Sequence, residues 1–433
     1  MSSRDTRRRK PNDASMSAPE TLGQTAEHIT APWLQAAPLK AVFAALSHEG
    51  GEARVVGGAV RNTLLGLPVT DIDIATTVLP DDVMRLCRAR GLIPHPTGIA
   101  HGTVTVMSGG QPFEITTLRR DVETDGRRAV VAFTDDWAKD AGRRDFTINA
   151  LYAAPDGKLF DDTGGRADLT ARRVRFIGDA HDRIREDYLR ILRFFRFSAQ
   201  YGLGPPDAAG LAACRDLRDG ITSLSAERIG MEILKLVVAT RASEIVPEMA
   251  KTGILEHVTG DPTGTDCFVR LTAIERTVEV APDAIGRLAA LLPEGAAANE
   301  LARRLRLSNR EAYALTAAMV PHPAYSPGVP LITAKAWLYR SGAENFGRGA
   351  RLAWARSKAP TNDHLHKEHA TLPERWAAPL MPVSGADVMA LGIPSGPAVG
   401  KILESFETWW IAHDFTNDLA AQQACLGALT RKS

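Results

Sequence analysis

The sequence contains little cysteine, with four residues in a chain of 433. Cys87, Cys214, Cys267 and Cys425 are far apart, and no two of them have the C-x-x-C spacing of a structural zinc site. The same scatter argues against the disulfide framework that stabilises small secreted domains. The cysteines therefore predict a protein of a reducing compartment, and we expect it in the cytoplasm.

Long apolar runs and a strong excess of one charge are absent as well. No apolar stretch reaches the roughly 20 residues that a membrane-spanning helix needs, and the first residues lack the apolar core of a secretory signal. The 52 basic and 51 acidic residues nearly cancel, which leaves a formal net charge of +1. We expect no membrane partner, and binding to nucleic acid would need local basic patches.

The most informative stretch runs from Val55 to Thr77 and reads VVGGAVRNTLLGLPVTDIDIATT. A short apolar strand is expected before the pair Gly57-Gly58, then a helix, then a second strand over 71–75. Glycines at a helix start let the backbone approach a phosphate closely and offer it N–H groups. Arg61, one turn into the helix, places a guanidinium where it can bind the same phosphates. The stretch therefore predicts nucleotide binding by Gly58 and Arg61.

The predicted second strand carries two carboxylates. Asp71 and Asp73 are two residues apart, and side chains at that spacing on a strand point to the same face. Two like charges on one face repel each other unless a cation lies between them. Mg²⁺ prefers hard oxygen ligands and is usually held by one or two carboxylates together with substrate phosphates. The pair and the phosphate site together predict metal-assisted nucleotidyl transfer, with both aspartates as catalytic metal ligands.

The stretch resembles motif A of the class II tRNA nucleotidyltransferase and bacterial poly(A) polymerase family, which is Gly-Gly-x-Val-Arg-Asp followed by Asp-x-Asp. The resemblance implies an α+β fold, in which a polymerase-β-like nucleotidyltransferase head with a mixed sheet precedes a helical neck, body and tail. The chain departs from the pattern at Asn62, where the family usually has Asp. Because an amide carries no charge, we expect no ionic role for this position.

A second match begins at Arg143, where the chain reads Arg-Arg-Asp-Phe-Thr-Ile-Asn-Ala and agrees with the family's motif B at every position. The resemblance implies that Arg144 contacts the nucleotide and that Asp145 lies near the sugar. Between the motifs, Glu114 is expected on a strand, either as a third carboxylate near the metals or as a plain exposed residue. Residues 119–128 are expected to form a loop near the triphosphate, in the region that the family links to adding the terminal adenosine.

A third match lies in residues 186–197, which are predicted to form one helix with Asp187, Arg190, Arg193 and Arg196 at three-residue steps. The spacing resembles the family's motif D and implies a reader of the nucleotide base. Cytosine and adenine present an amino donor beside a ring-nitrogen acceptor, which an Asp–Arg pair satisfies, whereas uracil and guanine present the reverse. An unpaired buried polar group costs about 1–3 kcal/mol, so two mismatches would give strong selection. The first Asp and Arg are predicted to select CTP and ATP, and the last two arginines to bind triphosphate or support the helix.

Two other clusters have a structural interpretation. The family's motif E is resembled by a stretch that contains Glu227, Arg228, Glu232 and Lys235, and we expect these residues to brace the neck through ion pairs. His364, His366 and His369 are close together, but no cysteine accompanies them. A polar helix surface is favoured over a zinc site there.

The predicted organisation has five parts: residues 1–28 a disordered basic tail, 29–165 the catalytic head, 166–240 a helical neck with the base reader, 241–357 a helical body and 358–433 a helical tail that binds tRNA. The predicted reaction is template-independent addition of CCA to tRNA 3′ ends from CTP and ATP with Mg²⁺, releasing pyrophosphate. The alternatives are a poly(A) polymerase, an enzyme that adds only CC or only A, and a non-catalytic RNA-binding protein. The intact Asp71 and Asp73 argue against the last of these.

Overall fold

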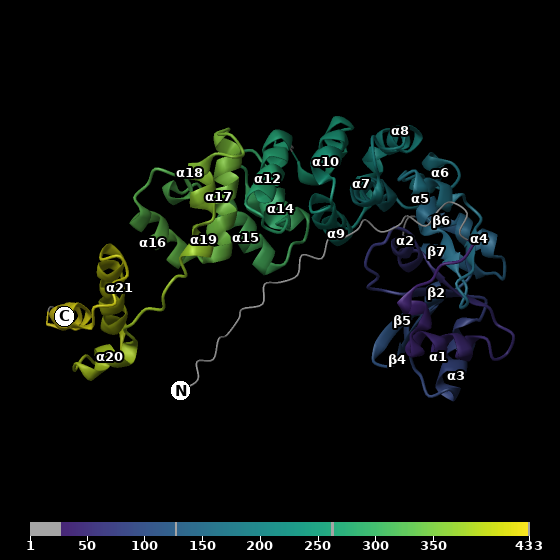
Figure 1. Cartoon of the computed structure of the whole chain (residues 1–433), viewed down its shortest axis with the longest axis horizontal. Helices are drawn as coiled ribbons and strands as arrows, with labels where there is room; N and C mark the ends of the chain where they lie inside the picture. The colour runs from purple at the N-terminus through teal and green to yellow at the C-terminus, as the bar shows by residue number, and fades with distance from the viewer. Residues whose placement is uncertain (1–26, 126–127, 261–263, 432–433) are drawn as a thin grey trace, which may run out of the picture. The chain divides into compact units, whose positions relative to one another are not determined.

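The computed structural model describes residues 27–125, 128–260 and 264–431, which belong to two compact units (Figure 1). The first unit runs to Asp187 and also takes in Leu203–Gly210, and the second comprises Tyr188–Gly202 and Leu211–Ser433. The first unit thus extends past the head predicted over 29–165. The predicted tail falls mostly on residues 1–26, which lie outside the described residues.

A seven-stranded mixed sheet forms the centre of the first unit, with the order β3-β4-β5-β2-β1-β8-β9. Strands β2 and β5 are parallel, and the other neighbouring pairs are antiparallel. The strands are β1 (Ala53–Val56), β2 (Asp73–Thr76), β3 (Ile93–Gly98), β4 (Thr103–Ser108), β5 (Gln111–Thr117), β8 (Leu151–Ala153) and β9 (Leu159–Asp161). The mixed sheet confirms the predicted class of the head.

The hairpin of β4 and β5 shows why these residues form strands. Buried and half-buried side chains alternate along β4, and Val104 and Val106 face the core with no exposed surface. Gly109 and Gly110 form the turn with positive φ angles of 56° and 78°, which residues with a Cβ rarely adopt. The register of this hairpin fixes which β5 side chains point away from the core.

Short helices surround the sheet. Helices α1 and α3 pack against β4, on the side of the unit where Figure 1 shows them together. Helix α3 begins with Pro80 and has Asp81 and Asp82 in its first turn, an arrangement that favours a helix start. The helices of this unit are η1 (Pro32–Gln35), α1 (Ala37–Leu46), α2 (Gly58–Leu64), α3 (Pro80–Ala89), η2 (Ile99–His101), α4 (Trp137–Gly142), η3 (Thr147–Asn149), α5 (Gly165–Thr170) and α6 (Ala180–Glu186).

The predicted loop over 119–128 is wrong. The structure has a two-stranded antiparallel sheet there, made of β6 (Arg119–Asp125) and β7 (Arg128–Phe133). Residues 126 and 127 lie outside the described residues. Cross-strand backbone hydrogen bonds let even a charged segment adopt extended structure, which is why polar composition alone was misleading.

The second unit is helical throughout its described residues, as predicted. Its helices are α7 (Leu189–Tyr201), α8 (Ala208–Asp216, which begins in the first unit), η4 (Arg218–Ser223), α9 (Ala226–Val237), α10 (Ala242–Lys251), α11 (Ile254–Thr259), α12 (Thr265–Thr277), α13 (Ala284–Ala290), α14 (Ala298–Arg304), α15 (Asn309–Met319), η5 (Pro323–Tyr325), α16 (Leu331–Ser341), α17 (Ala343–Ser357), α18 (His364–Ala370), α19 (Leu372–Arg375), α20 (Gly385–Ala390), α21 (Pro397–Ala412) and α22 (Leu419–Thr430). Among the described residues, every helix is too short or too polar to cross a membrane.

The single helix predicted over 186–197 is interrupted. Helix α6 ends at Glu186, Asp187 has extended backbone angles (φ −157°, ψ 106°), and α7 starts at Leu189. Aspartate is a poor residue for a helix interior because its carboxylate competes for nearby backbone N–H groups, and it favours helix ends instead. The base reader predicted on one helix therefore begins at a helix junction.

Candidate active site

The glycine turn after β1 has the backbone shape that only glycine adopts easily. Gly57 has φ 73° and ψ −117°, and it immediately precedes α2. Its N–H donates to the Leu151 carbonyl of β8 at 3.1 Å, so that N–H serves the fold. The N–H groups available to an anion at this turn therefore begin at Gly58, the first residue of α2.

Arg61 lies at this turn, as predicted. A Cβ atom added at Gly58 would be 3.8 Å from Nη2 of Arg61, so the guanidinium lies close to the backbone of the turn. The Arg61 side chain is buried, and its Nη1 donates to Oδ1 of Asn149 at 2.5 Å. Since Asn149 belongs to motif B, this hydrogen bond joins motif A to motif B through two residues that are 88 positions apart.

The hydrogen bonds of Asn62 use both the acceptor and the donor of its amide, at a position where the family usually has Asp. Its Oδ1 accepts from Nε and Nη2 of Arg61 at 3.2 and 2.9 Å, while its Nδ2 donates to the Pro68 carbonyl at 2.8 Å. A carboxylate could accept from the arginine but could not donate to the carbonyl. The amide therefore fastens Arg61 to the turn that leads toward Asp71.

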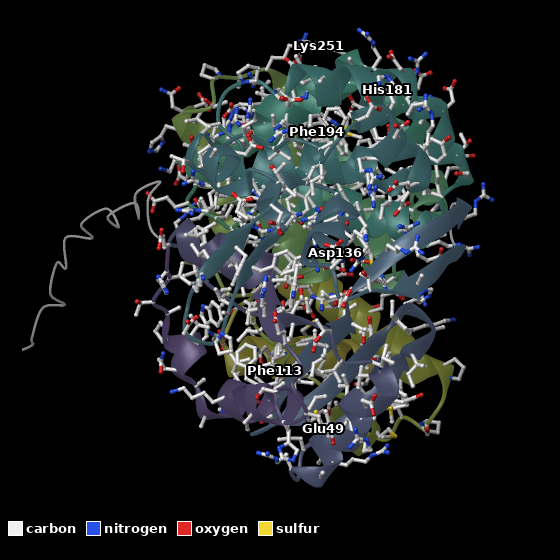
Figure 2. The ribbon with its side chains drawn as sticks, turned by 90° about the vertical axis from the view of Figure 1, so that its right-hand side faces the viewer. Glu49, Phe113, Asp136, His181, Phe194 and Lys251 are labelled. Atoms are coloured by element: carbon white, nitrogen blue, oxygen red, sulfur yellow. The ribbon has the colours of Figure 1, made fainter. Side chains whose placement is uncertain are left out.

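Three carboxylates come together at the start of β2. The strand begins at Asp73, so Asp71 lies before it, and the predicted strand over 71–75 is corrected by two residues. Asp73 pairs in register with Glu114 of the parallel strand β5. Phe113, which Figure 2 labels, is only 1% exposed. Its neighbour Glu114 points to the opposite face, because successive side chains of a strand alternate. The register therefore places Glu114 beside Asp73, and its side chain is exposed, so a role as a third carboxylate near the metals stays a prediction.

The electrostatics of this group fit a cation. Solvent reaches Asp73, yet partial desolvation raises its pKa, and the charges of Glu114 and Asp71 raise it further, while Arg144 acts against them. Hard carboxylate oxygens that repel one another are the donor set that Mg²⁺ prefers. Within the described residues no three or more His, Cys, Asp or Glu side chains are already arranged around a metal position. Substrate phosphates would therefore supply part of the coordination shell.

Motif B brings a second guanidinium to the glycine turn. Arg144 donates from Nη2 to Asp140 at 3.1 Å and from Nε to the Tyr152 hydroxyl at 3.1 Å. A Cβ atom added at Gly57 would lie 4.0 Å from its Nη1. Asp145 is buried, and its Oδ1 accepts from the Phe146 amide and from Asn149. Arg144 thus faces the site, whereas the visible hydrogen bonds of Asp145 hold motif B together.

The arginines of α7 have different surroundings. Arg196 donates from Nε to Glu232 of α9 at 2.5 Å, and Nη1 of Arg193 lies 3.7 Å from the same carboxylate. These contacts favour helix support, which was one of the two predicted roles of the pair. They also confirm the ion-pair bracing expected of Glu232. Asp187 directly follows the last residue of α6, and Arg190 lies in the first turn of α7.

Comparison with known proteins gives this geometry its context. The family described as "Poly A polymerase head domain" matches residues 53–175, and the one described as "Probable RNA and SrmB- binding site of polymerase A" matches residues 207–262. The zebrafish (Danio rerio) protein named CCA tRNA nucleotidyltransferase 1, mitochondrial, is 36% identical over 374 residues, which cover 83% of each chain. The chain belongs to the CCA tRNA nucleotidyltransferase family. It is accordingly a nucleotidyltransferase.

Two bacterial members of the CCA tRNA nucleotidyltransferase family agree with this assignment. The CCA-adding enzyme of Geobacillus thermodenitrificans is 33% identical over 372 residues, 83% of this chain and 89% of that protein. The crystal structure of the Bacillus stearothermophilus CCA-adding enzyme in complex with CTP superposes with a TM-score of 0.66 at 27% identity, and the match covers 89% of this chain and 94% of that one. The match extends over both units, so the helical remainder belongs to the family fold as well as the head.

Two residues that hold Arg144 of this family member are not among those that the sequence predicts. Asp140 and Tyr152 both contact Arg144. A signal for the first was available, because Asp140 precedes Arg143 by three residues and Arg144 by four, the spacing of side-chain pairs at a helix end. Nothing local could have found Tyr152, because its contact depends on how β8 lies in the sheet.

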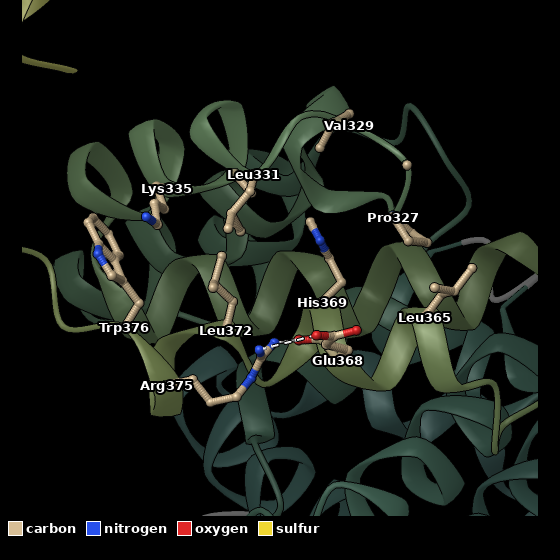
Figure 3. A pocket seen from close by; sticks show the side chains of 12 residues that line it. Pro327, Val329, Leu331, Lys335, Leu365, Glu368, His369, Leu372, Arg375 and Trp376 are labelled. Carbon is tan, nitrogen blue, oxygen red and sulfur yellow. Dashed lines mark hydrogen bonds and ion pairs between the residues drawn. The ribbon is translucent and has the colours of Figure 1, made fainter. Parts of the chain in front are cut away.

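Two of the three histidines of α18 have separate partners. Nδ1 of His366 lies 2.7 Å from Asp363, and Nε2 of His369 lies 2.6 Å from the Ala324 carbonyl. Figure 3 shows His369 among the residues that line a pocket of the second unit, with Leu331 and Leu372 beside it. Burial lowers the pKa of His369, which favours a neutral ring in that position. These contacts agree with the structural interpretation of the cluster.

Proposed function

We propose that this chain adds C, C and A to the 3′ end of tRNA, using CTP and ATP with Mg²⁺ and releasing pyrophosphate. The observation that carries the proposal is the meeting of Asp71, Asp73 and Glu114 beside a glycine turn with two arginines, in a chain of the CCA tRNA nucleotidyltransferase family. Such a site combines carboxylates for a cation with donors for a triphosphate, which are the two requirements of nucleotidyl transfer.

Each group then has a role in the transfer. Asp71 and Asp73 would hold Mg²⁺, and the bound ion would supply activation of the RNA 3′-hydroxyl and stabilisation of the departing pyrophosphate. Gly58, Arg61 and Arg144 bind the triphosphate through backbone N–H and guanidinium groups. Because the triphosphate is held in place before reaction, the 3′-hydroxyl needs only to be aligned with its α-phosphorus.

The base is selected by the protein. In this proposal Asp187 accepts from the amino group of cytosine or adenine, and Arg190 donates to the ring nitrogen beside it. Arg193 and Arg196 lie further along the same helix. Their contacts with Glu232 favour a role in supporting α7. Uracil and guanine would leave a donor facing Arg190 and an acceptor facing Asp187, each without a partner.

We assign the binding of tRNA to the helical remainder of the chain. We assign residues 166–240 as the neck, 241–357 as the body and 358–433 as a tail that binds tRNA, with recognition through backbone and shape because one enzyme must accept all tRNAs. The cytoplasm remains the proposed compartment, on the ground that the four cysteines are widely separated. The zebrafish relative carries the word mitochondrial in its name.

The deciding experiment uses a tRNA that ends at the discriminator base, with Mg²⁺ and single or mixed nucleotides, and measures product length. Three additions that require both CTP and ATP are the expected result. Two additions with CTP and none with ATP would replace the proposal with a CC-adding enzyme, and a long ladder with ATP alone would replace it with a poly(A) polymerase. Binding of tRNA without any product would favour an RNA-binding protein.

Base selection gives a separate prediction. Asp187→Ala should lower the preference for CTP over UTP by about tenfold to a hundredfold, because it removes the acceptor whose mismatch costs about 1–3 kcal/mol. The measurement is kcat/KM for each nucleotide on the same tRNA. Asp182→Ala is the matched control, since Asp182 lies on α6, the helix that ends just before Asp187, in an exposed pair with Arg185. An unchanged preference for CTP over UTP in the Asp187 variant would contradict a role of this residue in base selection.

A further inference from the structure

Asp140 is a fully buried carboxylate that the proposed chemistry does not use. It lies on α4 with no exposed surface, and both of its oxygens are engaged. Oδ1 accepts from Nε of Arg143 at 2.8 Å, and Oδ2 accepts from Nη2 of Arg144 at 3.1 Å and from the Tyr152 hydroxyl at 2.7 Å. Burial alone would raise the pKa of Asp140, but the two guanidinium groups outweigh it and hold the pKa below its ordinary value.

Tyr152 completes a closed arrangement around Arg144. Its hydroxyl donates to Asp140 and accepts from Nε of Arg144 at 3.1 Å, so the three side chains form a ring of hydrogen bonds. The Tyr152 ring is also fully buried and contacts Trp137 edge to face at 5.4 Å. A rigid phenol in this position leaves the guanidinium of Arg144 one orientation in which both donors are satisfied.

The sheet register connects this ring of hydrogen bonds to the glycine turn. Tyr152 of β8 pairs directly with Val56 of β1, the residue that precedes Gly57. The strand that carries the phenol therefore also positions the turn. Nη1 of Arg144, which has no hydrogen-bond partner among the described residues, is the atom that lies toward Gly57. The guanidinium is thus fixed by two of its nitrogens while the third faces the site.

We propose that Asp140 and Tyr152 are positioning residues that hold Arg144 in the orientation in which its Nη1 binds the incoming nucleotide. The inference rests on the proposed function, since it assigns a purpose to the same site. A guanidinium on a flexible side chain loses rotamer freedom when it binds a ligand, and one that is already fixed does not. Asp140 and Tyr152 therefore act on nucleotide affinity through Arg144 and touch no substrate themselves.

The test compares Tyr152→Phe, Asp140→Asn and Arg144→Gln with the intact enzyme, and measures equilibrium binding of CTP as well as kcat and KM in tRNA extension. Tyr152→Phe keeps the buried ring and removes one hydroxyl, so we expect CTP affinity to fall about threefold to tenfold. Asp140→Asn, which loses the charge, should weaken CTP binding about tenfold to a hundredfold. In both variants KM for CTP should change while KM for tRNA stays constant.

A double variant separates positioning from general support. If Asp140 acts through Arg144, then Asp140→Asn should have little further effect on CTP affinity in an Arg144→Gln background. Additive losses in the double variant, or wild-type CTP affinity in Tyr152→Phe, would overturn the proposal. The phenylalanine variant keeps the test decisive even where Asp140→Asn folds poorly.

The matched control is Glu275→Gln. It makes the same carboxylate-to-amide change in a buried ion pair, but in the second unit, with Arg287 as the partner. It should lower the melting temperature and leave CTP affinity unchanged. If it weakens CTP binding as much as Asp140→Asn does, the effect of Asp140 is one of stability, and the inference fails. Wild-type enzyme that binds CTP but extends no tRNA would refute the proposed function alone, and the affinity measurements would still decide the role of Asp140.

Discussion

Asp73→Ala is expected to lower nucleotide addition by about a thousandfold or more. Loss of a metal ligand removes several kcal/mol of transition-state stabilisation, and each 1.4 kcal/mol is worth about tenfold in rate. Asp71→Ala should have a comparable effect, because Asp71 is the second proposed metal ligand and its charge acts on Asp73. The measurement is the single-turnover rate of CTP addition to a tRNA that lacks CCA, at saturating Mg²⁺.

The structure also predicts how the Asp73 variant behaves without substrate. In the wild type, desolvation and the charges of Glu114 and Asp71 raise the pKa of Asp73 in the folded protein, so the charged carboxylate costs stability above its ordinary pKa, and alanine should relieve that cost. We therefore expect a melting temperature at least as high as that of the wild type in metal-free buffer, and a smaller gain on adding Mg²⁺. Asp81→Asn, an exposed acid in the first turn of α3, is the control and should keep full activity. Wild-type rates in both the Asp71 and the Asp73 variant would contradict the assignment of these residues as metal ligands.

Glu275→Ala is expected to lower the free energy of unfolding of the second unit by about 3–5 kcal/mol. Glu275 and Arg287 are 1% and 6% exposed, and Nε of the arginine lies 2.7 Å from Oε2 of the glutamate. Burial raises the pKa of Glu275, and Arg287 only partly offsets that effect. Removing the glutamate would leave a buried guanidinium whose remaining hydrogen bond within the described part of the chain is the one to the Val237 carbonyl at 2.7 Å. Urea unfolding followed by far-ultraviolet circular dichroism measures the change.

Two further variants show whether the loss comes from an unpaired buried charge. Glu248→Ala breaks an exposed i, i+3 pair with Lys251 of the same length, 2.7 Å, and should change stability by about 0–1 kcal/mol. Glu275→Leu combined with Arg287→Met should recover most of the stability, since neither charge is then left buried alone. A double variant no better than Glu275→Ala would mean that packing, and not charge, explains the loss.

The parts of the site that were predictable are those whose signals are local. Gly57, Arg61 and the two aspartates fall within one short stretch, where turn, helix and strand chemistry can be interpreted directly. The pairing of Asp73 with Glu114 was only one of two options, because it depends on a parallel contact between β2 and β5 that no local pattern specifies. Pairing between strands that are distant in sequence cannot be predicted from local patterns alone.

The errors have equally specific causes. The loop prediction over 119–128 overlooks the Asp125-Gly126 dipeptide, which is a typical hairpin-turn signal. The helix over 186–197 was drawn through Asp187 because the three-residue spacing looked continuous, and the preference of aspartate for helix ends was given too little weight. The Asp-Gly turn signal and the helix-end preference of aspartate both agree with the structure that is observed.

The hydrogen bond between Arg61 and Asn149 also constrains when the catalytic centre can form. The residues are 88 positions apart, and the pairing of Val56 with Tyr152 spans a similar length of chain. Contacts this distant in sequence form only after a long loop has closed, which makes them slow steps in folding. During synthesis, a chain that has not yet been made through Ala153 has motif A without the strand that orders it. The enzyme therefore gains its active site only once the whole head has left the ribosome.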